Sequence, residues 1–426
     1  MKVLIVGGGG REHALAWKIS QSPLLTKLYA APGNAGIAKM AEAFPVQADD
    51  IEKLVEIAKK NQIDLTVVGP ESPLVAGIVD RFQKEGLKIF GPSKAAALLE
   101  GSKSFAKDLM MKFGVPTAPY EVFGHINEAK HYVIETEMPI VIKADGLAQG
   151  KGVMICDSSQ AAVSALTQIM AEGVFGQAGQ KVVIESLLEG EELSILALTD
   201  GEKIIPLASS QDHKRAYDND HGPNTGGMGA YSPCPFISEE KFKEIVDLTI
   251  RPMIQGMKVA GTPYRGLLYA GIMLTKNGPY VLEYNCRFGD PEAQAVIPRM
   301  KSDLLPVLAE IASGSLQTTA LEWREKACLA IVLASGGYPG FYHKGFPIQG
   351  IESLSKHEDV FVFHAGTELG PKGDVQTSGG RVLSMVALGE NLRAAHDRAY
   401  SLIGQIRFEG MTYRRDIGRR ALEVLR

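Results

Sequence analysis

Short apolar runs alternate with amphipathic stretches along the first hundred residues of the chain. The run at residues 2–6, KVLIV, is typical of a buried parallel strand, and further strands are indicated at 27–31, 65–68 and 87–90. Apolar positions at helical spacing fill the intervals, up to about residue 20, near 50–60 and after Pro73. This alternation predicts a doubly wound α/β domain over residues 1–100.

The pattern is less regular in the middle of the chain and changes again near its end. Helices are expected at 98–113 and 238–258, and strands at 140–142, 181–185 and 267–275. The strand at 181–185 continues into ESLLEGEELSI, whose alternating acids indicate an edge strand with solvated carboxylates. From about residue 320, strands with turns and a helix at 391–406 predict a small α+β domain. We therefore expect domains at 1–100, 101–322 and 323–426.

The composition is that of an ordinary soluble globular protein. Of the 426 residues, 45% are apolar and 22% are charged. A formal net charge of -4 argues against a nucleic-acid-binding protein. The four cysteines are scattered without a CxxC pair, which favours reduced thiols. No apolar run suits a signal peptide or a membrane span, so we expect a cytoplasmic protein.

The stretch VLEYNCRFGDPE, residues 281–292, carries the most informative polar pattern and reads as a strand that runs into a loop. Because side chains alternate faces along a strand, Glu283, Asn285 and Arg287 point the same way. Glu283 and Asn285 offer hard oxygen ligands for Mg²⁺, and Arg287 offers a planar fork for a phosphoryl group. A magnesium–nucleotide complex would satisfy all three side chains. The alternative is a buried structural ion pair with a capping asparagine.

Four consecutive glycines, residues 7–10, separate the first strand from a helix. Such a turn leaves backbone N–H groups free to hold an anion, and a tight packing turn is the alternative. The G-x-G-x-x-G fingerprint fails because Glu12 or His13 occupies the third glycine position, which disfavours a dehydrogenase. Glu71 follows the strand at 65–68 at its carboxyl end, where such sheets bind ligands. A charge at a helix N-terminus explains Glu71 equally well.

A lysine at the end of an apolar strand stands beside a glycine-rich loop in MPIVIKADGLAQGKGV, residues 138–153. Lys143 ends the strand, and the glycines that follow it suit a flexible lid over nucleotide phosphates. The P-loop pattern fails, because Gly152 replaces the serine or threonine and a strand follows. Upstream, Lys103 and Lys107 are typical of a solvated helix face.

Residues 209–231 form a polar, glycine-rich segment with almost no apolar periodicity. A loop of this length is usually functional or disordered, and its polar side chains favour function: Asp212, His213, Lys214, Asn224 and Thr225. Four arginines near the end of the sequence look like a basic patch, but an exposed helix face explains them as well, so none is given a role: Arg414, Arg415, Arg419 and Arg420.

Several long strings resemble the phosphoribosylamine–glycine ligase family of ATP-grasp enzymes. RFGDPEAQA at 287–295 resembles the signature of that family, and SQDHKR, GPNTGGMGAYSP and FHAGT agree with it. The resemblance extends from GGGGREHALA to YRRDIG, with Gly8 where asparagine is frequent in the family. It implies an N-terminal doubly wound α/β domain, a central ATP-grasp fold with a lid subdomain at about 115–190, and a small C-terminal α+β domain.

The resemblance also implies roles for individual residues. Arg287 is expected to stabilise the transferred phosphoryl group, and Lys103 and Lys143 to hold the phosphates of ATP. Glu283 and Asn285 are the expected ligands of Mg²⁺ or Mn²⁺, and the preceding strand, GLLYAGIML, has no further metal carboxylate. The lid, the adenine hinge and the ribose contact are expected at Gly146, Gly150, Lys151, Gly152, Glu185, Leu188 and Glu192. The other substrates are expected at Gly7, Gly9, Gly10, Glu71, Asp212, Asn224, Thr225 and Asp290. Asp212 and Asp290 are candidates for the glycine ammonium because of their carboxylates alone, and not because of the resemblance.

The implied reaction converts ATP, glycine and 5-phosphoribosylamine into ADP, phosphate and glycinamide ribonucleotide, through glycyl phosphate, in purine biosynthesis. ATP is thus a co-substrate, and the expected partners are small molecules only, with no nucleic acid or membrane. We expect a monomer. Two alternatives remain at this stage: an ATP-grasp ligase for another carboxylate or amine, which would differ in 209–231, and a module that binds ATP without turnover.

Overall fold

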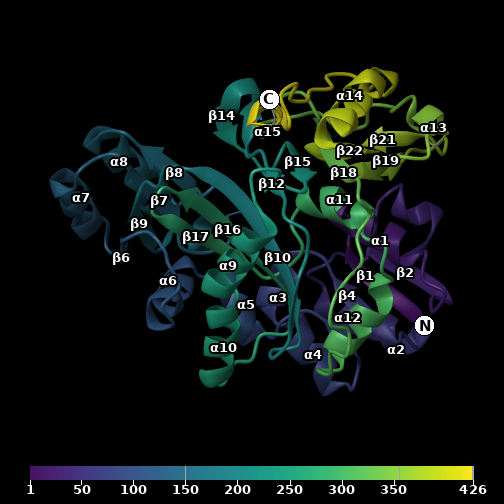
Figure 1. The fold of residues 1–426 in the computed structure, drawn as a ribbon, viewed down its shortest axis with the longest axis horizontal. Helices are drawn as coiled ribbons and strands as arrows, with labels where there is room; N and C mark the ends of the chain where they lie inside the picture. Colours follow the sequence, from purple (N-terminus) through teal and green to yellow (C-terminus); the bar gives the residue numbers. More distant parts are fainter. Residues whose placement is uncertain (149, 355, 425–426) are drawn as a thin grey trace.

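The N-terminal part of the chain is a five-stranded parallel sheet in the order β3-β2-β1-β4-β5. The computed structural model describes residues 1–148, 150–354 and 356–424 (Figure 1). The strands are β1 (Lys2–Gly7), β2 (Lys27–Pro32), β3 (Glu42–Ala43), β4 (Leu65–Val68) and β5 (Ile89–Phe90). The helices are α1 (Gly10–Ile19), α2 (Ile51–Asn61), α3 (Glu71–Ala76) and α4 (Ile78–Lys84). The predicted doubly wound domain is confirmed, and its strand order reverses between β1 and β4, where such sheets hold ligands.

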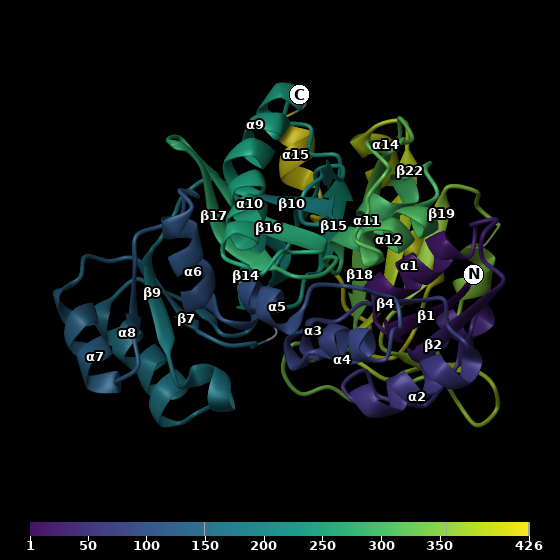
Figure 2. The ribbon, with the colours of Figure 1, turned by 90° about the horizontal axis from the view of Figure 1, so that it is seen from below.

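The middle of the chain builds two antiparallel sheets, and the one that holds residues 120–186 projects from the rest of the molecule (Figures 1 and 2). One has the order β6-β9-β7-β8, from β6 (Tyr120–Phe123), β7 (Ile140–Ala144), β8 (Val153–Cys156) and β9 (Val182–Ser186). The other has the order β11-β10-β16-β17, from β10 (Glu191–Thr199), β11 (Ile204–Pro206), β16 (Gly266–Thr275) and β17 (Gly278–Asn285). The associated helices are α5 (Lys94–Gly101), α6 (Lys103–Lys112), α7 (Ile126–Glu135), α8 (Ser159–Leu166), α9 (Glu239–Thr249) and α10 (Arg251–Val259).

Three predictions about this region are wrong. The strand at 181–185 is not an edge strand, because β9 lies between β6 and β7, and Glu191 and Glu192 belong to β10 in the other sheet. The helix expected at 98–113 is two helices, because Ser102 caps α6 with its side chain as acceptor of the Phe105 N–H. The helix expected at 238–258 is likewise divided, at Ile250 between α9 and α10.

The C-terminal part contributes three strands to a five-stranded sheet in the order β12-β15-β18-β22-β19. They are β18 (Ala327–Ala334), β19 (Val360–His364) and β22 (Arg381–Gly389), joined by β12 (Gln211–Asp212) and β15 (Gly229–Ser232). Smaller elements are the hairpins β13 (Arg215–Tyr217) with β14 (His221–Asn224) and β20 (Thr367–Leu369) with β21 (Val375–Thr377), and the helices α11 (Glu292–Val296), α12 (Leu304–Ala312), α13 (Ile351–Leu354), α14 (Leu392–Leu402) and α15 (Arg419–Val424). The polar segment 209–231 is therefore not a structureless loop. It joins the central part to the C-terminal sheet.

The arginines near the end of the chain do not share one exposed helix face, which was one of the two explanations that the sequence allowed. Arg414 is only 1% exposed and forms ion pairs with Asp220 and Asp416. Arg420, on α15, also pairs with Asp220. A buried guanidinium needs such carboxylates to offset its desolvation, so these residues anchor the C-terminal segment to the β13–β14 hairpin. Within residues 1–148, 150–354 and 356–424, no helix is long and apolar enough to cross a membrane.

Candidate active site

A cavity of about 730 Å³ lies where the N-terminal, central and C-terminal parts meet. Most of the residues predicted for the site line it: Glu71, Lys103, Lys143, Gly150, Lys151, Gly152, Glu185, Leu188, Glu192, Asp212, Asn224, Thr225, Glu283, Asn285, Arg287 and Asp290. Four predicted residues do not line it: Gly7, Gly9, Gly10 and Gly146. Residue 149, in the expected lid, lies outside the described residues.

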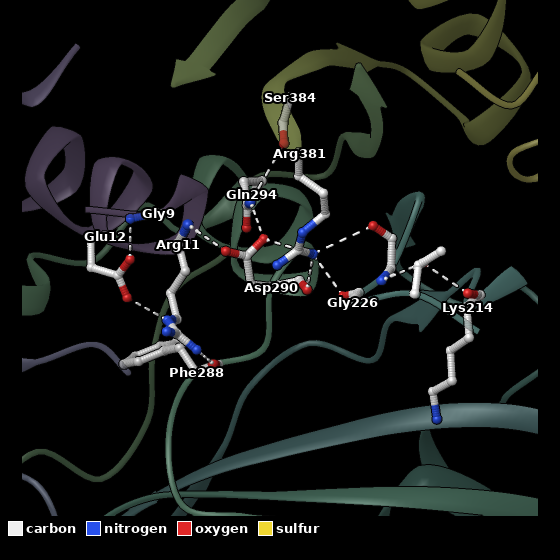
Figure 3. Close-up of polar contacts among 12 residues, drawn as sticks. Gly9, Arg11, Glu12, Lys214, Gly226, Phe288, Asp290, Gln294, Arg381 and Ser384 are labelled. Atoms are coloured by element: carbon white, nitrogen blue, oxygen red, sulfur yellow. Dashed lines mark hydrogen bonds and ion pairs between the residues drawn. The ribbon is translucent and has the colours of Figure 1, made fainter. Parts of the chain in front are cut away.

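The carboxylate of Glu12 lies in the glycine turn after β1. Glu12 sits at the third position of α1, and its Oε2 accepts the backbone N–H of Gly9 at 2.5 Å (Figure 3). Its Oε1 pairs with the Arg11 Nε at 2.6 Å. Gly69 must be a glycine, because a Cβ there would collide with the Glu12 carboxylate. The prediction of free N–H groups for a substrate anion is therefore wrong for Gly9.

Glu283 and Asn285 project from β17 into the cavity, as the strand alternation predicts. No hydrogen bond to the Glu283 carboxylate occurs among the described residues, and its one ion pair is with the Lys214 Nζ at 4.0 Å. Burial favours the neutral acid, but Lys214 and Lys143 outweigh it and hold the pKa of Glu283 below its usual value. Glu283 is thus an ionised carboxylate whose one ion pair, with Lys214, is long, and which accepts no hydrogen bond from a described residue.

Arg287 is held in a fixed orientation by two acids from the N-terminal half of the chain. Its Nε lies 3.2 Å from the Glu71 Oε2, and its Nη2 lies 2.9 Å from the Glu100 Oε1. A third hydrogen bond runs from its Nη1 to the carbonyl of Phe288 at 3.2 Å. Burial disfavours ionisation of Glu71, but Arg287 and Arg11 dominate and lower its pKa to about 2. Glu71, at the start of α3, therefore also orients Arg287.

Three charged side chains from three elements form one buried cluster beside the cavity. Both Lys143 and Lys107 pair with the Glu185 carboxylate, one on each oxygen. Lys143 also donates to the Leu282 carbonyl at 3.1 Å, and Lys107 donates to the Thr117 Oγ1 at 2.7 Å. Lys107 is 2% exposed, so its predicted place on a solvated helix face is wrong. The cluster fixes the position of the Lys143 ammonium.

Lys103 and the glycine-rich loop lie on the same side of the cavity. The Lys103 Nζ donates to the Gly146 carbonyl at 3.2 Å, and burial lowers the pKa of Lys103. Lys103 is therefore also not on a solvated helix face. At the far end of the loop, the Lys151 Nζ donates to the Pro339 carbonyl at 3.3 Å. The loop therefore contacts the C-terminal part through Lys151. Just after the loop, the Val153 carbonyl accepts the Asn224 Nδ2 at 3.4 Å.

The segment 209–231 brings both acids and bases into the cavity. The Lys214 Nζ lies 3.3 Å from the Glu192 Oε2. Burial and neighbouring carboxylates raise the pKa of Asp212 to about 8, although Lys214 opposes the shift. His213 instead accepts the backbone N–H of Gly418 at 3.3 Å, and it is buried. His213 thus holds the chain end in place.

Asp290 connects all three parts of the chain at the edge of the cavity (Figure 3). Its Oδ2 accepts the Arg11 N–H at 3.3 Å, its Oδ1 lies 3.3 Å from the Arg381 Nη1, and the Gln294 Nε2 donates to Oδ1 at 2.8 Å. Arg381 also donates to the Gly226 carbonyl at 2.6 Å. Both oxygens of Asp290 already have partners within the protein, which leaves few of its lone pairs for a substrate ammonium.

Three family models match the chain in succession, so its membership of one family can be decided. The description "Phosphoribosylglycinamide synthetase, N domain" matches residues 1–100, the corresponding "ATP-grasp (A) domain" matches 101–293, and the "C domain" matches 328–420. The chain belongs to the phosphoribosylamine–glycine ligase family. It is therefore an ATP-grasp ligase, and the predicted fold class is confirmed.

Individual members of this family match along their whole length. The phosphoribosylamine–glycine ligase of Caldanaerobacter subterraneus subsp. tengcongensis is 49% identical over 417 residues, which cover 98% of this chain and 99% of the relative. The crystal structure of the Thermotoga maritima phosphoribosylamine–glycine ligase is 35% identical and superposes with a TM-score of 0.84, over 98% of this chain and 100% of that one.

The fold extends beyond the family. The biotin carboxylase domain of the Hydrogenobacter thermophilus 2-oxoglutarate carboxylase, solved with MgADP, ADP and bicarbonate, superposes with a TM-score of 0.75 at 18% identity. That match covers 97% of this chain and 91% of the other. At this identity the likeness concerns the fold alone.

Several charged residues at the site were not singled out from the sequence. They are Arg11, Glu100, Glu292 and Arg381, which all line the cavity. Arg11 stands inside the quoted string GGGGREHALA, and Glu292 stands inside RFGDPEAQA, so the family motifs held a signal for both. Glu100 and Arg381 lie in ordinary helix and strand sequence, and only the tertiary structure reveals their partners.

Proposed function

We propose that this protein ligates glycine to 5-phosphoribosylamine and converts ATP into ADP and phosphate. One observation carries the proposal. The carboxylate of Glu283 and the guanidinium of Arg287 line the same cavity as the side chains of Lys103 and Lys143, in a chain of this family. An array of this kind is suited to binding a triphosphate and stabilising a phosphoryl group in transfer.

The nucleotide would bind along the central sheets. Lys103 and Lys143 would hold its phosphates, and the loop 144–152, with Gly146, Gly150, Lys151 and Gly152, would cover them. The backbone from Glu185 to Leu188 would read the adenine, and Glu192 would accept the ribose hydroxyls. The Glu185 side chain has a different task, because both its oxygens already hold lysines.

The donor set fits a magnesium or manganese ion. Glu283 and Asn285 present hard oxygens, and the Glu283 carboxylate has no hydrogen bond from any described residue. No group of three His, Cys, Asp or Glu side chains in the described ranges is arranged as a metal site, so the other ligands would be phosphate and water oxygens. When bound, the ion supplies positive charge that neutralises the phosphates.

The chemistry needs two displacements. A carboxylate oxygen of glycine attacks the terminal phosphorus of ATP, ADP leaves, and glycyl phosphate forms. The amine of phosphoribosylamine then attacks the acyl carbon, phosphate leaves, and the new amide nitrogen loses a proton. Arg287 would neutralise charge on the phosphoryl group in the first step, and Lys143 would hold the phosphate chain in line.

The other two substrates would bind where the three parts of the chain meet. Asp212 is the preferred receptor for the glycine ammonium, whose positive charge would shift this carboxyl from the neutral acid to the carboxylate. Asn224 and Thr225 line the same cavity, and Asp290 positions Arg381 and α1. Glu71 would lie near the ribosyl phosphate substrate. Gly7, Gly9 and Gly10 would act there only by shaping the turn, since Glu12 already takes the Gly9 N–H.

We also propose the three-part division at 1–100, 101–322 and 323–426, with the lid at about 115–190. The sheet that unites β12 and β15 with β18 supports treating 209–231 as a bridge between the last two parts. We further propose a cytoplasmic, monomeric enzyme that binds neither nucleic acid nor membrane. None of these proposals depends on the proposed reaction.

Phosphate release from ATP tests the proposed reaction, with glycine and phosphoribosylamine each omitted in turn. Rapid release should require both substrates, and glycinamide ribonucleotide should form in a one-to-one ratio with ADP. Equal release with alanine in place of glycine, or with another amine, would favour a different ATP-grasp ligase. ATP binding without any turnover would favour a non-enzymatic module.

A further inference from the structure

Lys214 is placed to act as a fixed cation inside the cavity. Its backbone carbonyl accepts two hydrogen bonds from Thr225, from the backbone N–H and from Oγ1, both at 2.8 Å. These two hydrogen bonds hold the backbone of Lys214, from which its side chain extends, in place. From there the side chain extends away from the Arg381 and Asp290 contacts (Figure 3). Its ammonium ends 3.3 Å from the Glu192 Oε2 and 4.0 Å from the Glu283 Oε1.

The two carboxylates come from strands on either side of β16. Glu192 on β10 stands opposite Met273, and Glu283 on β17 stands opposite Gly271. Neither Met273 nor Gly271 can carry a charge, so β16 provides nothing to neutralise the acids on each side of it. Lys214 reaches this place from outside the sheet and contacts both acids.

Without Lys214, the carboxylates of Glu192 and Glu283, with the Asn285 amide oxygen in the same cavity, would offer hard ligands to a divalent cation. The Lys214 ammonium at the same place offsets the negative charge of the two carboxylates, so no cation from solvent is needed there. We propose that Lys214 is the resident cation between Glu192 and Glu283: it excludes a second divalent ion from that place and turns its own charge toward the nucleotide phosphates. The reference to nucleotide rests on the proposed function, whereas the exclusion of the ion does not.

Manganese binding to the nucleotide-free protein, measured by electron paramagnetic resonance of free Mn²⁺, tests the exclusion directly. Lys214→Met and Lys214→Gln should each gain one Mn²⁺ site per chain, at least about tenfold tighter than any site of the unchanged protein. Lys214→Arg, which keeps the charge, should gain none. The gain should disappear when Glu192→Gln is added to Lys214→Met, because the new site needs both carboxylates.

Lys258→Met is the matched control, because the exposed Lys258 pairs with a single carboxylate, that of Glu202. It should gain no Mn²⁺ site. The proposal is overturned if folded Lys214→Met and Lys214→Gln bind Mn²⁺ as the unchanged protein does. It is also overturned if Lys258→Met gains the same site, or if the gain survives Glu192→Gln.

A second arm adds ADP to the same titrations. The unchanged protein should then hold one Mn²⁺ per chain, and Lys214→Met should hold two. If the protein fails to bind ADP, the proposed function fails in this arm, while the nucleotide-free result still decides whether Lys214 excludes the ion. The two failures are therefore distinguishable.

Discussion

The carboxylate of Glu12 accepts the backbone N–H of Gly9 at 2.5 Å, inside the glycine turn that joins β1 to α1. The same carboxylate pairs with Arg11, whose own backbone N–H donates to Asp290. A buried acid therefore occupies the place where a free anion would bind to such a turn. Arg11, which Glu12 holds, connects the start of α1 to the loop after β17 through Asp290 and the Phe288 carbonyl.

Glu12→Gln tests this structural role. The amide keeps the shape of the side chain but leaves the buried guanidinium of Arg11 without its charged partner, so the free energy of unfolding should fall by roughly 3 kcal/mol. Urea denaturation measures the change. Glu42→Gln is the control, because Glu42 pairs with Lys27 on the surface, with both side chains about half exposed, and the expected change is under about 1 kcal/mol. Equal effects of the two substitutions would contradict the role of Glu12.

Arg287→Lys should lower turnover far more than it weakens ATP binding. Lysine keeps the charge but cannot hold the Glu71 and Glu100 contacts together while presenting a fork to a phosphoryl group. Turnover should fall by about a hundredfold or more, with a change of only a few-fold in the dissociation constant of ATP. Steady-state kinetics and nucleotide titration separate the two quantities. A loss that lies mostly in ATP affinity would mean that Arg287 holds the ground state.

The glycine-rich loop should be protected by nucleotide. Gly150 has a φ of 73°, a conformation that glycine adopts readily, and Lys151 is exposed near the end of the loop. Trypsin should cleave after Lys151 quickly in the free protein and slowly with Mg²⁺ and a non-hydrolysable ATP analogue. Cleavage after the exposed Lys112, outside the loop, provides the comparison. Equal protection at both lysines, or at neither, would count against a lid.

Stability should fall as the pH is lowered below about 6.5, partly through His13. Burial, with His364 and Lys39 nearby, lowers the pKa of His13 to about 3, and its Nδ1 accepts the His364 backbone N–H at 2.7 Å. Between pH 6.5 and pH 3, His13 therefore binds a proton in the unfolded chain but not in the folded chain. The contribution of neutral His13 to the free energy of unfolding is complete above pH 6.5 and is lost as the pH falls through this range. From pH 7.5 to 5.5 this histidine should account for a loss of about 1 kcal/mol.

His13→Asn should reduce that pH dependence, because asparagine offers an oxygen acceptor at a similar place but does not titrate. Urea denaturation at pH 7.5 and at pH 5.5 gives the difference in the free energy of unfolding. His131→Asn is the matched control, since His131 is exposed on α7. If both substitutions leave the pH dependence unchanged, His13 does not contribute in the way described.

Local sequence patterns predicted which side chains share one face of a strand or helix. The period of two along a strand placed Glu283 and Asn285 on one face, and the structure has both in the cavity. Glu12 accepts the N–H of Gly9, the residue that caps α1, from the third position of the helix, as the glutamate of a capping box does, so that contact had a local signal. The alternation of strands and helices along the N-terminal part likewise follows from the periodicity of its apolar residues.

Contacts between distant parts of the chain could not be predicted in this way. The spacing of charges on α6 does not reveal which face is covered, so Lys107 was expected in solvent although Glu185 and Thr117 bury it. The pair of Arg287 with Glu100 and that of Arg381 with Asp290 bring together segments far apart in sequence. Such pairs depend on the packing of whole domains, which no local pattern encodes.

The transfer of oxygen from glycine to phosphate tests the proposed chemistry most directly. If a glycine carboxylate oxygen attacks the terminal phosphorus of ATP, that oxygen leaves with inorganic phosphate when the amine attacks the acyl carbon. Glycine labelled with ¹⁸O in its carboxylate should therefore yield phosphate with one labelled oxygen, together with ADP. Mass spectrometry of the phosphate and of the nucleotide product gives the answer. Label recovered in AMP, or phosphate without label from glycine, would contradict a glycyl phosphate intermediate in this cavity.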